Sequence, residues 1–155
     1  MATLQSSYTG TIAKGYAGMV PNAETSNRIS RTVEDAAGIA FGLPVYRGTD
    51  DHGCTATVGT LATFYGWTMS KNDLAVTSTR DADEYAQYDS AAIVTSGTIL
   101  IEVTGAVTDG AAITVGTGAS AADGYGATTA DATHIATGWV ADETVTDGLC
   151  RIAKR

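Results

Sequence analysis

The residues that could carry out chemistry in this chain are few and scattered. Asp50-Asp51-His52 combines carboxylate and imidazole ligands, but three consecutive side chains point in different directions and their neighbours favour a loop. We therefore interpret this segment as a solvated turn rather than a metal site. Cys54 lies too close to His52, in the same loop, to define a nucleophile–base pair, and we expect a buried, inert thiol. His134 heads an apolar segment just after Asp131 and is interpreted as structural.

Two further segments resemble binding motifs without completing them. Residues 81–89 group four carboxylates but lack the order of a calcium loop, and residues 116–121 half-match a dinucleotide fingerprint with no helical pattern after it. The sequence contains no nucleophile elbow, zinc-protease motif, phosphate loop or paired-cysteine zinc pattern. We therefore expect a protein that is not an enzyme and that needs no metal or cofactor.

The elements that position these residues are predicted to be strands. Residues 96–105 are rich in β-branched side chains, alternate in polarity and end in glycine at both sides, and an Asp-Gly turn at Asp109-Gly110 leads into a second strand at 111–116. Further strands are expected at 27–33, 43–46, 55–58, 62–69, 91–95, 134–141 and 149–153. This pattern predicts an all-β fold, a small single-domain β-barrel or sandwich.

Two segments lack strand periodicity. Residues 1–26 contain several glycines and scattered hydrophobes, from which we expect an extended N-terminal arm that leads into a β domain at 27–155. Residues 117–133 consist almost entirely of Ala, Gly, Thr, Ser and Asp, a composition typical of a long surface loop. The arm carries apolar side chains that need a surface to cover, which a neighbouring molecule would offer.

The charge is distributed unevenly along the 155 residues. Residues 1–80 contain six Lys and Arg against six Asp and Glu, whereas residues 81–150 contain eleven acidic side chains and no Lys or Arg. A net charge of −8 argues against nucleic acid as a partner, because phosphates require clustered basic residues. The acidic half is either a face that aids solubility or the outward side of a molecule whose arginine-bearing half docks on a partner.

No apolar run approaches the roughly 18 residues of a membrane span, and the polar start lacks the pattern of an export signal, so we expect synthesis in a cytoplasm.

The order of segments along the chain is also informative. It resembles that of the head cement (decoration) proteins of tailed bacteriophages, in which a polar arm with a Gly-x-x-Gly element precedes a β domain. The matching segments are residues 1–5, 15–24, 39–45, 96–115 and 134–153.

The resemblance implies a structural virion protein, made in the host cytoplasm, that binds the outer surface of the capsid. Its partners would be the major capsid protein, whose neighbouring subunits it bridges, and itself, as a dimer or trimer. The resemblance brings no catalytic residues. The candidate capsid-binding residues are hydrophobes of the arm and arginines in or beside the first strands: Tyr8, Tyr16, Met19, Arg28, Arg31 and Arg47.

An alternative from another class is a carbohydrate-binding β-sandwich on a virion or cell surface. The richness of the chain in Thr and Ala is compatible with this function. Three aromatic residues, Trp67, Trp139 and Tyr125, could serve as stacking platforms for sugar rings. A hydrolase is a more distant possibility.

Overall fold

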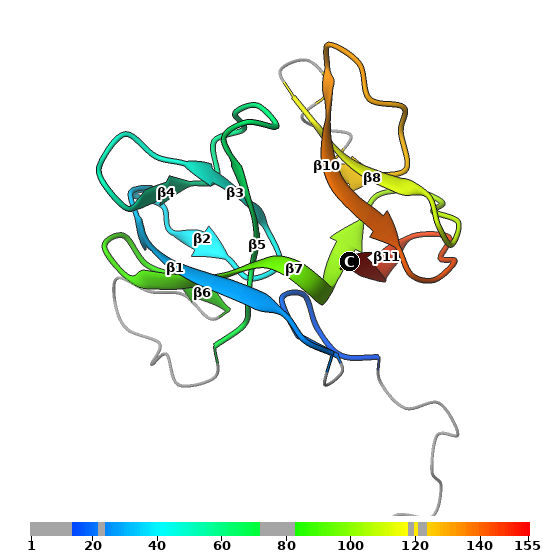
Figure 1. Ribbon diagram of the computed structural model, residues 1–155, viewed down its shortest axis with the longest axis horizontal. Helices are drawn as coiled ribbons and strands as arrows, with labels where there is room; N and C mark the ends of the chain where they lie inside the picture. Colours follow the sequence, from blue (N-terminus) through cyan, green and yellow to red (C-terminus); the bar gives the residue numbers. More distant parts are fainter. Residues whose placement is uncertain (1–13, 22–23, 72–82, 118–119, 121–123) are drawn as a thin grey trace, which may run out of the picture.

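The chain forms strands throughout the part that the structure describes. The computed structural model describes residues 14–21, 24–71, 83–117, 120 and 124–155, which contain eleven strands and no α-helix (Figure 1). The all-β prediction is thereby confirmed. The strands are β1 (Asn27–Val33), β2 (Ile39–Ala40), β3 (Pro44–Arg47), β4 (Gly53–Thr55), β5 (Phe64–Thr68), β6 (Glu84–Tyr85), β7 (Ser90–Val103), β8 (Ala112–Gly116), β9 (Tyr125–Gly126), β10 (His134–Ala141) and β11 (Gly148–Lys154).

Five strands close into a small barrel. They follow the order β1, β4, β3, β5 and β7, and the ring is completed because the first half of β7 also pairs with β1. All of these pairings are antiparallel except that of β1 with β4. Gly66 makes the tight approach of β5 to β7 possible, because a Cβ on this residue would lie 2.1 Å from the carbonyl oxygen of Val94.

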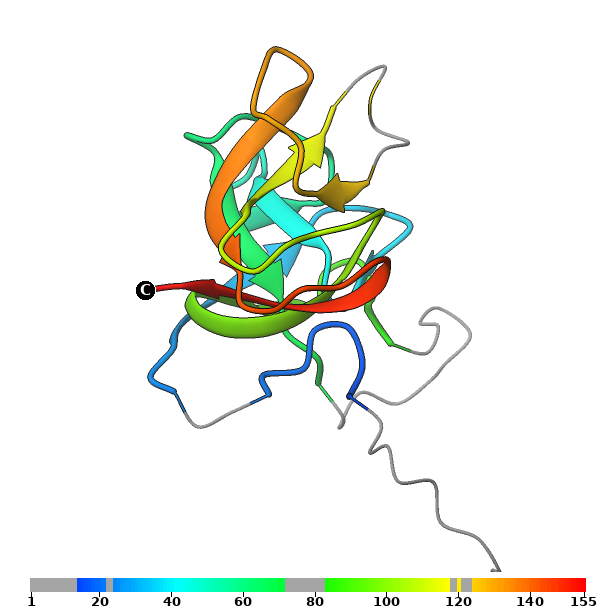
Figure 2. The ribbon, with the colours of Figure 1, turned by 90° about the vertical axis from the view of Figure 1, so that its right-hand side faces the viewer.

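The second half of β7 belongs to a different sheet. Figure 2 shows it running beside β11, and the sheet continues through β10 and β8 to β9. The sequence pattern predicts two strands here, at 91–95 and 96–105, but the structure has one strand of 14 residues. Gly97, with a φ of 114°, lets the strand continue through the change of sheet.

The buried hydrophobic residues form two clusters, and one of them combines residues of both sheets. One cluster contains Trp67, Trp139 and the residues Ile99, Ile101 and Val103 that alternate along β7. The other fills the barrel and extends to the small β2–β6 sheet. The long strand β7 therefore contributes to both cores, since Ala91 and Ile93 belong to the barrel cluster, whereas Val94 and the alternating residues after Gly97 belong to the other.

The N-terminal segment lies across the outer face of β7. Gly18 N–H donates to the carbonyl of Leu100 at 2.7 Å, and Leu100 N–H donates to the carbonyl of Met19 at 2.9 Å. Ser70 N–H donates in turn to the carbonyl of Gly18 at 2.8 Å. Leu100 is consequently buried although the alternation along β7 places it on the face opposite to Ile99. Residues 14–21 thus pack on the domain itself.

The segment expected as a surface loop contains a short strand. Tyr125 and Gly126 form β9, which pairs with Val115 and Thr114 of β8. The two-residue strands β2, β6 and β9 were not expected from the sequence, because such short elements have no measurable periodicity. The described residues contain no helix that is long and apolar enough to cross a bilayer.

Candidate functional site

Two of the predicted arginines meet in one pocket. Arg31 of β1 and Arg47 of β3 line it together with Tyr65 of β5, and its volume is about 370 Å³. The rest of its lining comes from the loop between β3 and β4, through Asp50, Asp51 and His52. We refer to these six residues as the arginine pocket. Residues that are far apart in the sequence meet here because β1, β3 and β5 are walls of the same barrel.

Arg31 is held in a defined position at this pocket. Its guanidinium carbon lies 5.0 Å from the centroid of the Tyr65 ring, a cation–π geometry. Its Nη1 donates to the carbonyl of Ser30 at 2.8 Å. Its Nε is buried and has no hydrogen-bond partner among the described residues. The side chain is thus half-buried and retains unused donor capacity, as a group that pairs with an incoming acceptor would.

Glu34, the residue directly after β1, organises the loop that lines the arginine pocket. The Glu34 carboxylate accepts hydrogen bonds from the main-chain N–H groups of Thr49 and Asp50 and from the Thr49 hydroxyl, each at 2.9 Å. The main-chain hydrogen bond from Thr49 contributes most to lowering the Glu34 pKa. His52, with a φ of 61°, is fixed to the strand by a hydrogen bond from Thr32 N–H to its carbonyl. The expected solvated turn is therefore an organised loop.

The third predicted arginine lies elsewhere. Arg28 is exposed on the outward face of β1, three residues before Arg31, and a strand places residues at this spacing on opposite faces. Its Nε donates to the hydroxyl of Ser26 at 3.0 Å. The structure therefore joins Arg31 to Arg47 but separates both from Arg28.

The arginines of the described residues, together with Lys14, fall into two groups. Lys14, Arg151 and Arg155 form ion pairs with Glu143, Asp142 and Glu24, at distances from 2.6 to 3.3 Å. By contrast, Arg28, Arg31 and Arg47 form no ion pair with any described residue, although Asp50 and Asp51 line the same pocket as two of them. These three guanidinium groups are the ones available to a carboxylate from outside the molecule.

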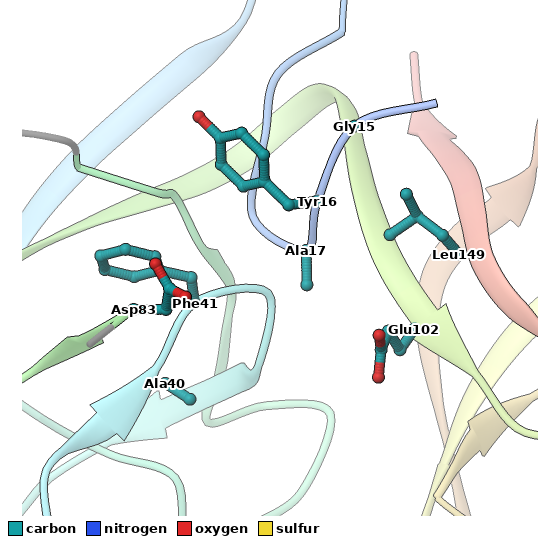
Figure 3. Close-up of a pocket in the computed structure, with 8 residues that line it drawn as sticks. All are labelled: Gly15, Tyr16, Ala17, Ala40, Phe41, Asp83, Glu102 and Leu149. Carbon is teal, nitrogen blue, oxygen red and sulfur yellow. The ribbon is translucent and has the colours of Figure 1, made fainter. Parts of the chain in front are cut away.

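A second concave surface lies beside the N-terminal segment. Figure 3 shows Gly15, Tyr16 and Ala17 facing Phe41 and Asp83 on one side and Glu102 and Leu149 on the other. This groove has a volume of about 380 Å³. The Tyr16 side chain is 46% exposed, whereas Met19 is half-buried and its main chain is bonded to β7. Of the predicted arm residues, Tyr16 is therefore accessible, and Tyr8 lies outside the described residues.

The other candidates have structural surroundings. Asp131 accepts hydrogen bonds from the main-chain N–H groups of Thr133 and His134 and lies 3.2 Å from His134 Nδ1, so it caps the start of β10. These contacts, led by the one from Thr133, lower the Asp131 pKa to about 2. Burial raises the pKa of both Cys54 and Cys150 to about 11, which keeps these thiols protonated at neutral pH. No three metal-ligating side chains gather anywhere in the described residues.

The proposed stacking platforms for sugar are not on the surface. Trp67 and Trp139 have no exposed area and belong to the main hydrophobic cluster. Tyr125 packs edge-on against Trp67, with the ring centroids 5.5 Å apart. The expectation that the two tryptophans bind sugar rings is wrong, because both are fully buried in the cluster between the barrel and the second sheet.

Comparison with known proteins adds evidence on the whole chain. A family model described as "Structural cement protein (E217 gp24/Pam3 gp6)" matches residues 4–154. No curated protein matches the sequence. A chain of the solved structure "The capsid of Myoviridae Phage XM1" superposes with a TM-score of 0.69, over 99% of this chain and 97% of that one. The two sequences are 15% identical, so this likeness concerns the fold.

Proposed function

Because the chain belongs to the structural cement protein family of bacteriophages, we propose that it binds the outer face of the assembled phage head and bridges neighbouring major capsid protein subunits. It is a structural protein of the virion, and the family is not one of enzymes. The proposal of where it docks rests on Arg28, Arg31 and Arg47, which form no ion pair with any residue that the structure describes.

The arginine-bearing half of the sequence faces the shell in this proposal. Three guanidinium groups without a carboxylate partner among the described residues are suited to bidentate hydrogen bonds with Asp and Glu of a partner. The eleven acidic side chains at 81–150, with no Lys or Arg among them, would suffer like-charge repulsion against an acidic shell surface. The carboxylates of the acidic half then face solvent.

The N-terminal arm extends the contact in this proposal. Tyr8 and Tyr16 supply aromatic side chains to the partner, while Gly18 and Met19 fix the segment to β7 through their bonds to Leu100. Extended segments suit such a role because they cover a large surface with few residues. Self-association into a dimer or trimer would add avidity to each individual contact.

The physical benefit of such a clamp arises from linkage. A protein that binds only the assembled shell stabilises assembly over dissociation by its binding free energy. Many copies act on one particle, so each contact can be of modest affinity. Nucleic acid and membranes have no role in this proposal. The carbohydrate-binding alternative is not retained because Trp67 and Trp139 are buried.

Cosedimentation with capsids that lack the protein tests this function. The purified chain should pellet with these capsids and saturate at a fixed ratio to the major capsid protein, and decorated capsids should resist heating better than bare ones. Free major capsid protein subunits serve as the control, because a bridging protein binds them much more weakly than the shell. Failure to pellet with capsids at any salt concentration would overturn the proposal.

A further inference from the structure

Tyr88 combines two unusual properties. Its side chain is 78% exposed, the highest value among the large hydrophobic residues that are exposed in the described part of the chain. Its φ is 69°, in the left-handed region that bulky side chains rarely adopt. Such a conformation costs free energy and persists only where the surrounding structure enforces it, often at a functional position. Glycine would adopt it without this cost.

The turn that carries Tyr88 is fixed firmly to β1. Tyr88 N–H donates to the carbonyl of Val33 at 2.9 Å, and Val33 N–H donates to the carbonyl of Asp89 at 3.0 Å. Gln87 Nε2 donates to the carbonyl of Glu34 at 2.9 Å. Each of these bonds positions the main chain, and none involves the Tyr88 ring or hydroxyl. The strained main chain therefore presents an aromatic side chain to the exterior in a fixed position.

The surface beside this turn has an unusual charge for this protein. The outward side chains of β1, Arg28, Ser30 and Thr32, are exposed, and Ser90 of β7 lies opposite Thr32 in the register. Ser30 and Ser90 bond to each other through their hydroxyls. We call these four residues and Tyr88 the β1 face. It contains one cation and no carboxylate, in a chain with a net charge of −8.

The nearest carboxylates are directed to other partners. The Glu34 carboxylate is occupied by the main chain of Thr49 and Asp50, and Asp89 Oδ2 accepts a hydrogen bond from Ala86 N–H. On the β1 face itself, an acidic partner meets one cation and no carboxylate. We take the major capsid protein rather than a second copy as the occupant of this face, because the proposed function places the chain on the shell.

We propose that Tyr88 is the aromatic anchor of the shell-facing surface, with its ring seated in a pocket of the major capsid protein and Arg28, at the other end of β1, paired to a separate carboxylate of the same partner. This inference rests on the proposed function and adds the contact that supplies most of the affinity. Tyrosine is enriched at such positions because it buries a large area and loses few rotamers. Fixing the main chain before binding lowers the entropy cost further.

Three substitutions at one position separate anchoring from folding. Tyr88→Ala and Tyr88→Gly should both lower the affinity for capsids by about tenfold or more, as loss of an interface anchor does. Tyr88→Gly should nevertheless melt at a higher temperature than Tyr88→Ala, because glycine relieves the left-handed strain. Tyr88→Phe should retain most of the affinity. Leu61→Ala is the matched control, since Leu61 is 55% exposed and lies outside the β1 face.

The possible outcomes distinguish this inference from the function on which it rests. If Tyr88→Ala binds capsids like the wild type while Arg28→Glu does not, Tyr88 is no anchor but the docking function stands. If Tyr88→Ala instead reduces the molar mass measured by analytical ultracentrifugation, the occupant of the face is a second copy and the inference is overturned. If the wild-type chain does not bind capsids, the proposed function itself fails.

Discussion

The Glu34 carboxylate occupies the space that a side chain on Gly53 would fill. A Cβ built on Gly53 would lie 1.6 Å from Glu34 Oε1, and one on Gly48 would lie 2.1 Å from the same atom. The two glycines lie at either end of the loop between β3 and β4. Main-chain N–H groups of this loop donate hydrogen bonds to the Glu34 carboxylate. One side chain of β1 thereby fixes the loop that lines the arginine pocket.

This relationship predicts a coupled pair of substitutions. Gly53→Ala should lower the free energy of unfolding by about 1–3 kcal/mol, because the added methyl group displaces Glu34 from the loop. In a Glu34→Ala background, Gly53→Ala should lower the free energy of unfolding much less, because the Glu34 carboxylate no longer occupies the space of the added methyl group. Urea unfolding of the two single variants and the double variant measures this coupling. Additive effects would mean that the two residues do not compete for space.

The docking orientation predicts a ranking of charge reversals. Arg47→Glu and Arg28→Glu should each weaken capsid binding by at least about tenfold, because each replaces a guanidinium group that is proposed to pair with a carboxylate of the shell by a negative charge. Lys154→Glu is a matched control, with the same change in charge at the end of β11. Cosedimentation at several salt concentrations measures all three. If Lys154→Glu weakened capsid binding and the two arginine variants did not, the proposed docking orientation would be wrong.

Acid stability should depend on Asp131. Hydrogen bonds lower its pKa from 3.8 to about 2 in the folded chain, so the folded state holds its proton less tightly than the unfolded state. Its contribution is therefore fully present above about pH 4 and is lost as the pH falls towards 2. The melting temperature of Asp131→Asn should be lower than that of the wild type at pH 6, and the difference should shrink at pH 2. An equal difference at both values would contradict this assignment.

The two thiols should be unreactive in the folded protein. Cys54 and Cys150 are buried and free, and the pKa of each is raised to about 11. A disulfide-exchange reagent at pH 8 should therefore label neither thiol in the native chain and both in denaturant without reductant. Rapid labelling of the native chain would show that one of the cores opens readily. Absence of free thiols after denaturation would indicate oxidation.

The arm has a testable contribution of its own. Deletion of residues 2–13 should weaken capsid binding by about tenfold or more while leaving the melting temperature nearly unchanged, because the bonds of Gly18 and Met19 to Leu100 remain. Gly18→Val should do the reverse and destabilise the fold, since a Cβ there would lie 2.9 Å from the main-chain nitrogens of Gly42 and Ser70. Equal capsid binding with and without residues 2–13 would remove the arm from the contact.

Local sequence was sufficient for most of the strands. Residues 27–33 and 134–141 are strands with the predicted bounds, because the β-branched residues that favour a strand lie within a few residues of each other. The order of segments also led to the cement protein family, which the family match confirms. These inferences needed no knowledge of which strands are neighbours.

Which residues become neighbours depended on the tertiary structure. Closure of β1 on β7 places Arg31 beside Arg47 and Arg28 on the opposite face, and the register between distant strands has no signature in either segment. The same long-range pairing buries Trp67 and Trp139, which a sequence reading takes for surface aromatics. Local patterns record a residue's preference for a strand, whereas its partners are chosen by packing against segments far along the chain.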